Sequence, residues 1–146
     1  MIKKRAEAFT LVELLVVIAI IGILSTLAVV SLQSARARAR DAKRITDVRQ
    51  IQMALEFYYN DWSHYPAAVV AGASIGSGTT IYMAQVPAGP TPADGDCVLS
   101  DYSYQQVNGG ASYLMEFCLS APTGSLSPGI NCASPSGIVA STTSCF

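Results

Sequence analysis

The side chains of this chain that could do chemistry are four cysteines, one histidine, three aspartates close in sequence and one glutamate inside an apolar run. The cysteines are Cys97, Cys118, Cys132 and Cys145. An even number of cysteines in a loop-rich region predicts two disulfides, with three possible pairings. We favour Cys97–Cys118 and Cys132–Cys145, because the first pair flanks a predicted hairpin. A turn centred near Gly109 would set Cys97 opposite about Ala121, so this pairing requires a bulge or an offset.

Metal and catalytic chemistry have weaker support. No C-x-x-C pair occurs and the only histidine is His64, which disfavours a zinc site. A single histidine beside a helix end is typical of a capping or solvated residue, so we expect no enzyme and no catalytic residue. The carboxylates of Asp94, Asp96 and Asp101 could bind calcium, which prefers oxygen ligands. The alternative for these acids is a solvated acidic loop, and we expect no other cofactor.

The glutamate is Glu13, near the start of the apolar run Phe9–Val30. Seventeen of these 22 residues are apolar or aromatic. As a helix the run is about 33 Å long, enough to span a hydrocarbon core of about 30 Å. A carboxylate inside such a span needs a partner, and is a functional hypothesis by default. We therefore predict a transmembrane helix over residues 9–30, with Glu13 in a functional role.

The residues before this run sharpen the hypothesis. Met1 to Ala8 contains three basic residues, Lys3, Lys4 and Arg5, and its small-residue junction precedes the apolar run instead of following it. This polarity is the reverse of an ordinary secretory signal peptide. Together with Phe9-Thr10-Leu11-Val12-Glu13-Leu14, the segment resembles the prepilin signature shared by type IV pilins and type II secretion pseudopilins. Two residues depart from the common pattern: Ala8 stands where Gly is usual, and Val30 where many members have Pro.

The resemblance implies a processing and assembly route. A prepilin peptidase in the membrane cuts between Ala8 and Phe9 and methylates the new amine of Phe9. Glu13 then becomes the fifth mature residue, and in a filament it pairs with the amine of Phe9 on a neighbouring subunit. Major pseudopilins often carry calcium in the region of Asp94, Asp96 and Asp101, although this sequence lacks their usual Asp-Pro-Trp-Gly loop.

The predicted helix continues beyond the membrane span. Residues 31–63 contain no Gly and no Pro, and an apolar stripe at steps of three and four predicts one face packed on a core. The stripe is Val48, Ile51, Leu55, Tyr58 and Trp62. Pro66 disfavours helical geometry at Tyr65 and marks a stop. The stretch Leu55–Pro66 also resembles the end of this helix in major pseudopilins, with matches at Leu55, Tyr58, Asp61, Tyr65 and Pro66.

The second half of the chain changes character. All seven Pro and ten of the eleven Gly lie at or after Pro66. Residues 79–86 favour one short strand, and residues 101–107 and 112–119 flank Asn108-Gly109-Gly110, a strong hairpin signal. Tyr113, Met115, Phe117 and Leu119 share one face, which we expect to pack on the helix stripe. The residues from Ser120 onward are rich in Ser, Pro, Gly and Thr, and their pattern predicts no structure.

The expected fold is α+β, a long helix packed on a small antiparallel sheet. Its predicted parts are a cytoplasmic leader (1–8), a transmembrane and filament-core helix (9–30), its amphipathic continuation (31–64) and an exported globular β domain (65–146) whose C-terminal part is disulfide-rich.

The basic residues raise two alternatives. All nine Lys and Arg lie at or before Arg49, and the run from Arg36 to Arg49 could bind nucleic acid or anionic headgroups. We favour a solvated helix face that pairs with its own acids at helical spacing: Arg38–Asp41, Asp41–Arg44 and Lys43–Asp47. The six Lys and Arg of this run outnumber the three before the apolar run. By the positive-inside rule alone, they would place the domain in the cytoplasm. The cysteines and the resemblance favour N-in, C-out, with a single pass through the inner membrane.

Together these features predict a structural subunit of a type IV pilus-like or type II secretion pseudopilus filament. The expected partners are prepilin peptidase, copies of itself, other pilin-like subunits, the inner-membrane assembly platform and lipid. One alternative is an exported binding domain on a membrane anchor that never polymerises. Another is a DNA-uptake pilin that uses Arg36–Arg49. The sequence does not distinguish secretion from adhesion, motility or DNA uptake.

Overall fold

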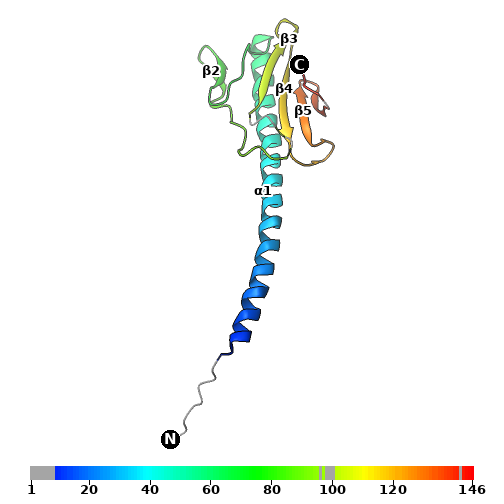
Figure 1. The fold of residues 1–146 in the computed structure, drawn as a ribbon. Coiled ribbons are helices and arrows are strands. Elements are labelled where there is room, and N and C mark those ends of the chain that lie inside the picture. The colour runs from blue at the N-terminus through cyan, green and yellow to red at the C-terminus, as the bar shows by residue number, and fades with distance from the viewer. Residues whose placement is uncertain (1–8, 96, 98–100, 142) are drawn as a thin grey trace. The chain divides into compact units, whose positions relative to one another are not determined.

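The computed structural model describes residues 9–95, 97, 101–141 and 143–146. Within them lie one α-helix, α1 (Leu11–Trp62), and six strands (Figure 1). The strands are β1 (Ile75–Ser77), β2 (Thr80–Met83), β3 (Ser103–Val107), β4 (Ser112–Leu119), β5 (Gly129–Ser134) and β6 (Gly137–Ala140). All pairings among these strands are antiparallel, so the predicted α+β class is confirmed.

Helix α1 runs without a break from the apolar run into the amphipathic stretch, as predicted from the absence of Gly and Pro in residues 31–63. It ends at Trp62, where Ser63 adopts a left-handed conformation with φ of 57°. The Ser63 N–H donates to the Tyr59 carbonyl at 2.8 Å and closes the last turn. The chain divides into two compact units, one ending at Arg36 and the other spanning Ala37–Phe146. Each unit is described separately below.

The unit Ala37–Phe146 contains a four-stranded sheet in the order β3-β4-β5-β6. Strands β3 and β4 form the predicted hairpin, with Gln105 opposite Leu114. A short 3₁₀ turn, η1 (Asn108–Gly110), joins them. All three turn residues have positive φ (53°, 63° and 94°), a region that Gly adopts without cost and Asn tolerates. The Asn-Gly-Gly sequence therefore fixes the hairpin.

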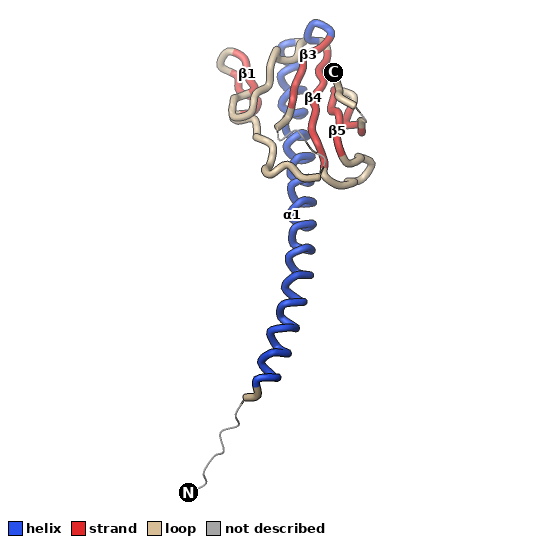
Figure 2. Tube along the Cα trace, in the orientation of Figure 1, coloured by secondary structure: helices blue, strands red, loops and turns tan. Residues whose placement is uncertain are grey.

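Three strands escaped prediction. Strands β5 and β6 arise from the tail, for which the sequence pattern indicated no structure, and they extend the sheet beyond β4 (Figure 2). The two segments are short (GINCAS and GIVA) and show no regular alternation of polar and apolar residues. Strand β5 pairs with β4, and β6 pairs with β5. Strand β2 falls within the strand predicted at residues 79–86, and it pairs with the unpredicted β1 in a separate two-stranded sheet.

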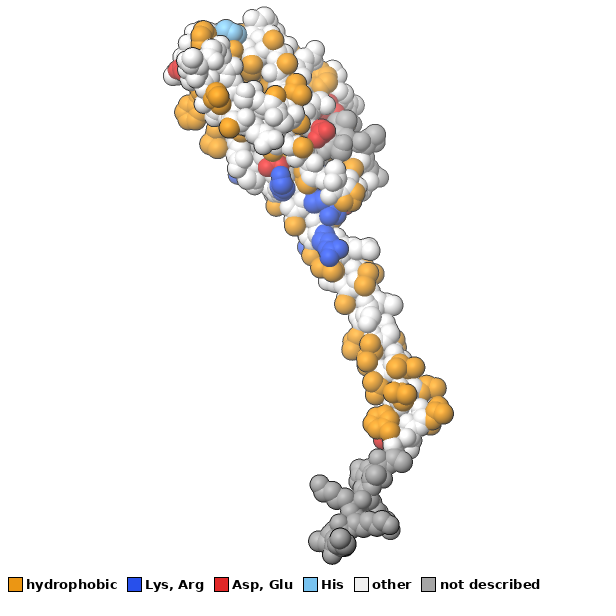
Figure 3. All heavy atoms as spheres, turned by 90° about the vertical axis from the view of Figure 1, so that its left-hand side faces the viewer, with side chains coloured by type: hydrophobic (Ala, Val, Ile, Leu, Met, Phe, Trp, Pro, Cys, Tyr) orange, Lys and Arg blue, Asp and Glu red, His pale blue; other side chains and the backbone are white. Residues whose placement is uncertain are grey.

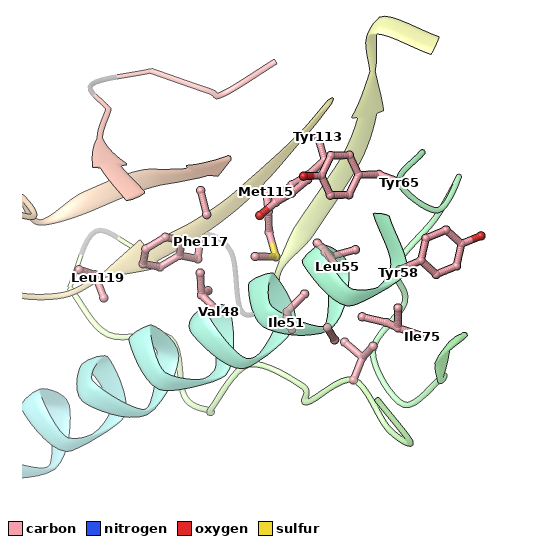
Figure 4. Close-up of a cluster of buried hydrophobic side chains, with 13 residues drawn as sticks. Val48, Ile51, Leu55, Tyr58, Tyr65, Ile75, Tyr113, Met115, Phe117 and Leu119 are labelled. Carbon is pink, nitrogen blue, oxygen red and sulfur yellow. The ribbon is translucent and has the colours of Figure 1, made fainter. Parts of the chain in front are cut away.

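The core lies between the C-terminal half of α1 and one face of β4. Figure 4 shows Val48, Ile51 and Leu55 of the helix beside the side chains of Met115 and Phe117. The predicted stripe and the predicted strand face are thus two sides of one cluster. Trp62, the last predicted stripe residue, lies at the helix end and is 44% exposed. Its indole N–H donates to the Tyr82 hydroxyl, so it ties β2 to the helix instead of filling the core.

A matched pair of substitutions tests this core. Phe117 is 1% exposed and Phe57, on the outer face of α1, is 63% exposed. Phe117→Ala should lower the free energy of unfolding by about 3–5 kcal/mol, because it leaves a cavity. Phe57→Ala should change it by no more than about 0.5 kcal/mol. Urea unfolding of the full chain in detergent, followed by near-UV circular dichroism, measures both, and equal losses would contradict this core.

Candidate assembly and anchoring site

The first site is the apolar surface of the N-terminal part of α1. Hydrophobic side chains cover this part of the helix on the face that Figure 3 presents. All described residues from Phe9 to Ala35 are exposed. Within the described residues, α1 is long and apolar enough to cross a membrane, judged by length and composition. A helix that is apolar on all sides requires an apolar environment around it, which is lipid or other helices.

At the start of this surface Thr10 and Glu13 form a reciprocal cap. The Glu13 backbone N–H donates to the Thr10 hydroxyl oxygen at 3.2 Å. In return, Glu13 Oε2 accepts from the Thr10 backbone N–H at 2.9 Å and from the Thr10 hydroxyl at 2.8 Å. This is a capping box, which satisfies N–H groups that the first helical turn leaves without partners. The Thr-x-x-Glu spacing was visible in the sequence, but we did not predict this role for Glu13.

The capping box leaves the second carboxylate oxygen available. Both hydrogen bonds from Thr10 to the Glu13 side chain use Oε2, so Oε1 can accept from a cation outside this helix. Phe9, whose amine is the predicted cation on a neighbouring subunit, is 73% exposed. Ala8, the predicted residue before the cut, lies outside the described residues. The geometry thus places an exposed carboxylate at the beginning of an exposed apolar helix.

Both predicted disulfides are present in the unit Ala37–Phe146, where all four cysteines are described. Cys97–Cys118 has an S–S distance of 2.01 Å, and Cys132–Cys145 has 1.96 Å. Cys97 lies in the loop before β3 and not in the ladder, so the loop supplies the offset that the first pairing required. The second disulfide attaches the last residues of the chain to β5. Glu116 holds the same segment by accepting from Ser144 and from the Cys145 N–H.

The predicted acidic loop does not hold free carboxylates. Both oxygens of Asp94 accept from the guanidinium of Arg40, and Asp101 Oδ1 accepts from the Gly89 N–H at 3.0 Å. Asp96 lies outside the described residues. Within the described part no group of three or more His, Cys, Asp or Glu side chains is arranged to hold a metal ion. Asp94 does not fit the calcium hypothesis, and it is not a solvated loop residue either, because both of its carboxylate oxygens are already bound to Arg40.

The Arg40 contact also determines the charge state of Asp94. The hydrogen bond from Arg40 holds the pKa of this carboxyl below its ordinary value, and Coulombic attraction from Arg40 and Arg44 adds to the effect. A depressed pKa in the fold contributes stability that is complete above the unfolded pKa and is lost as pH falls through the folded one. The ion pair therefore remains formed at neutral pH and weakens only in acid.

The basic run is not the solvated face that we expected. The predicted pairs Asp41–Arg44 and Lys43–Asp47 are present, each at 2.8 Å. Asp41, Arg44 and Asp47 are buried, however. The proline-rich loop contacts Arg44, the chain after β4 contacts Asp41, and the Tyr102 hydroxyl donates to Asp47 at 2.8 Å. Arg38 was expected to pair with Asp41, but Arg38 is exposed while Asp41 bonds to Arg44, Ser120 and Ala121. Three of the six basic side chains in the run, Arg40, Lys43 and Arg44, are bound to carboxylates.

His64 follows the end of α1 as expected for a capping residue. Its Nδ1 lies 2.8 Å from the Trp62 carbonyl oxygen, and the ring is exposed. In the tautomer protonated at Nδ1 it donates to this carbonyl, one of those that a helix end leaves unpaired.

Comparison with known proteins gives a match at the start of the chain. The family model described as the prokaryotic N-terminal methylation motif matches residues 3–29. Type II secretion system core protein G of Aeromonas hydrophila is 39% identical over 64 residues, which are 44% of this chain and 45% of that protein. The protein of the same name from Escherichia coli K12 is 39% identical over 62 residues, which are 42% of this chain and 43% of that protein.

The matched segment therefore spans less than half the length of these curated relatives. A third relative with the same name, from Vibrio cholerae, is 36% identical over 63 residues, 43% of each chain. The predicted resemblance is confirmed: the chain carries the prepilin-type methylation motif and is pseudopilin-like.

Alkylation tests the disulfides. Iodoacetamide should label no cysteine of the full chain before reduction and all four after it, because all four are paired. Reduction should lower the free energy of unfolding by about 2–4 kcal/mol per disulfide. Membrane insertion should be unchanged, since it depends on residues 9–30. Labelling of four thiols without reduction would contradict the pairing, and carbonate extraction before and after reduction provides the insertion control.

Proposed function

We propose that this pseudopilin-like chain is a structural subunit of a type II secretion pseudopilus or a related type IV pilus-like filament. The observation that carries the proposal is the coincidence of three features in one segment. The methylation motif covers residues 3–29, the helix within it is exposed and apolar, and an exposed carboxylate stands at its start. The curated relatives are named as components of a type II secretion system.

The proposed mechanism is an exchange of environments for the apolar helix. Before assembly, lipid surrounds residues 9–30 in the inner membrane. Prepilin peptidase cuts between Ala8 and Phe9 and methylates the new amine. The assembly platform then moves the helix out of the lipid, and helices of identical and related subunits take the place of the lipid. Because both environments are apolar, the gain comes from packing and from the pair that Glu13 Oε1 forms with the amine of Phe9 on the next subunit.

The proposed topology places residues 1–8 in the cytoplasm and the disulfide-bonded unit outside it. Two disulfides indicate an oxidising compartment. The charge bias opposes this, since the run from Arg36 to Arg49 contains six basic residues and the leader contains three. We give the disulfides more weight, because they would not persist in a reducing cytoplasm.

Two other functions have less support. A DNA-uptake pilin that reads phosphates with Arg36–Arg49 would need free cations, but Arg40 and Arg44 are committed to Asp94 and Asp41. An exported binding domain on a simple anchor would account for the apolar helix, but not for a carboxylate within it. A catalytic role is not proposed, since the relatives are named as core proteins of a secretion system.

The mature amino terminus tests the processing step. We expect purified protein to begin at N-methylated Phe9, because the basic leader, the small Ala8 and the motif all converge there. Mass spectrometry of the intact chain and of its first peptide measures this. A chain that retains Met1, or one cut after Val30, would refute the prepilin mechanism.

The capping box allows the charge of Glu13 to be separated from its role at the helix start. Glu13→Gln retains an oxygen that can cap the Thr10 N–H but removes the charge. Thr10→Ala removes the hydroxyl that caps Glu13 and keeps the carboxylate. We expect Glu13→Gln to abolish filaments, since leaving one partner of a buried pair unmatched costs about 3–5 kcal/mol. Thr10→Ala should assemble, with a helix start weakened by about 1 kcal/mol.

Electron microscopy and shear fractions count the filaments of each variant. Mass spectrometry of the same cells checks that both variants are cut at Phe9, so that a processing defect is not mistaken for an assembly defect. Normal filaments from Glu13→Gln would show that the charge is not the assembly contact. Loss of filaments in Thr10→Ala as complete as that in Glu13→Gln would show that assembly requires the intact capping box, and would contradict the assignment of the defect to the charge alone.

A further inference from the structure

A buried ionic cluster joins three segments in the unit Ala37–Phe146. On the helix, Asp41 is 1% exposed and Arg44 is 2% exposed. The guanidinium of Arg44 donates to Asp41 Oδ1 at 2.8 Å and to the backbone carbonyls of Pro90 and Pro92 at 3.0 and 3.4 Å. Arg40 binds Asp94 in the same loop, and Arg44 Nη1 lies 3.9 Å from Asp94 Oδ2.

Asp41 connects this cluster to the chain after β4. Its carboxylate accepts from the Ser120 N–H at 3.0 Å, from the Ser120 hydroxyl at 2.6 Å and from the Ala121 N–H at 3.0 Å. The disulfide between Cys97 and Cys118 ties the same two segments together a few residues away. The cluster therefore fixes the proline-rich loop 87–95 and residues 120–121 onto the helix.

The oxygens around the two guanidinium groups are of the kind that calcium binds. They comprise the carboxylates of Asp41 and Asp94 and two backbone carbonyls, and calcium sites are built from such oxygens. Arg44 donates hydrogen bonds to three of these groups, and Arg40 donates to both oxygens of Asp94. Like a bound cation, these arginines gather oxygens from separate segments, but they are covalently part of the chain and remain charged at every physiological pH.

We propose that the guanidinium groups of Arg40 and Arg44 serve as the built-in cations of loop 87–95, so that this domain holds its fold without calcium. The charges support this arrangement. Among the side chains of the cluster that the structure describes, two arginines face two aspartates, so these four offer an incoming divalent cation no excess negative charge. Calcium would have to displace an arginine from a site where that arginine is 2% exposed.

The first test compares the thermal unfolding of the full chain in detergent with about 5 mM calcium and with EGTA. This concentration exceeds the dissociation constants of about 10⁻⁴–10⁻³ M typical of extracellular calcium modules. Near-UV circular dichroism follows the tyrosine-rich core. We expect the two unfolding temperatures to agree within about 1 °C. A rise of about 3 °C or more in calcium would overturn the proposal, since a ligand that binds the folded state must raise this temperature.

The second test removes the guanidinium. Arg44→Met should lower the unfolding temperature by about 10 °C or more in calcium and in EGTA alike, because it strands Asp41 and two carbonyls. Arg49→Met, the same substitution at an exposed arginine on the same helix, is the control and should shift it by no more than about 2 °C. The unfolding temperature of Arg44→Lys should lie between those of Arg44→Met and Arg49→Met, since an ammonium group keeps the charge but lacks the planar set of donors of a guanidinium.

Equal shifts for Arg44→Met and Arg49→Met would overturn the proposal. If Arg44→Met yields no folded protein, Arg40→Met provides the same comparison. The Arg40 side chain is 22% exposed and carries the other half of the loop contact. If Arg40→Met lowers the unfolding temperature no more than Arg49→Met does, the proposed role of the arginines is contradicted. A larger fall in the unfolding temperature that calcium does not reverse would support it.

Discussion

The exposed apolar surface of the N-terminal part of α1 is the constraint on which the rest of the structure depends. Each large apolar side chain gains about 1.5–3 kcal/mol when it leaves water, and seventeen apolar or aromatic residues lie between Phe9 and Val30. Such a surface requires an apolar environment, which in the proposed function is first lipid and then, in the filament, other helices. Because lipid would surround this segment on all sides, its apolar residues need not be confined to one face of the helix. The stripe at Val48, Ile51 and Leu55 appears where only one side of the helix is packed.

A helix that begins in an apolar environment has a second difficulty, which is its unpaired N–H groups. The first turn leaves four of them without partners, and their desolvation is costly. Thr10 and Glu13 reduce this cost through the capping box, and the negative charge of Glu13 is favourable at the positive end of the helix dipole. The same side chain keeps Oε1 for a contact outside the helix. One glutamate thus meets a local requirement of the helix and, in the proposed filament, supplies the charge for assembly.

Local patterns predicted much of this fold, and distant contacts account for what was missed. The uninterrupted helix, the stripe and the Asn-Gly hairpin follow from rules that act over a few residues. The Cys97–Cys118 pairing was favoured because these cysteines flank that hairpin, and Cys132–Cys145 is the pair that then remains. Strands β5 and β6 were missed because their short segments become strands only by pairing, β5 with β4 and β6 with β5. The burial of Arg44 was missed for a similar reason. Its spacing to Asp41 fits a solvated ion pair equally well, and the groups that cover it lie 46 to 48 residues away.

The ionic cluster lies where the helix enters its domain, and in the proposed filament, where the helix would hold the subunit, this position would give it a mechanical role. Asp41 is the first buried residue along α1, so a force applied to the N-terminal segment reaches the domain there first. Apolar packing resists sliding weakly, because it has no direction, whereas hydrogen bonds between charged groups weaken steeply when their geometry is lost. Asp41 and Arg44 bond to segments 79 and 46 residues away, and a disulfide joins those segments to each other. Along α1 the hydrogen-bonded charged residues Asp41 and Arg44 therefore precede the apolar core, which begins at Val48. They would bear such a force before the core does.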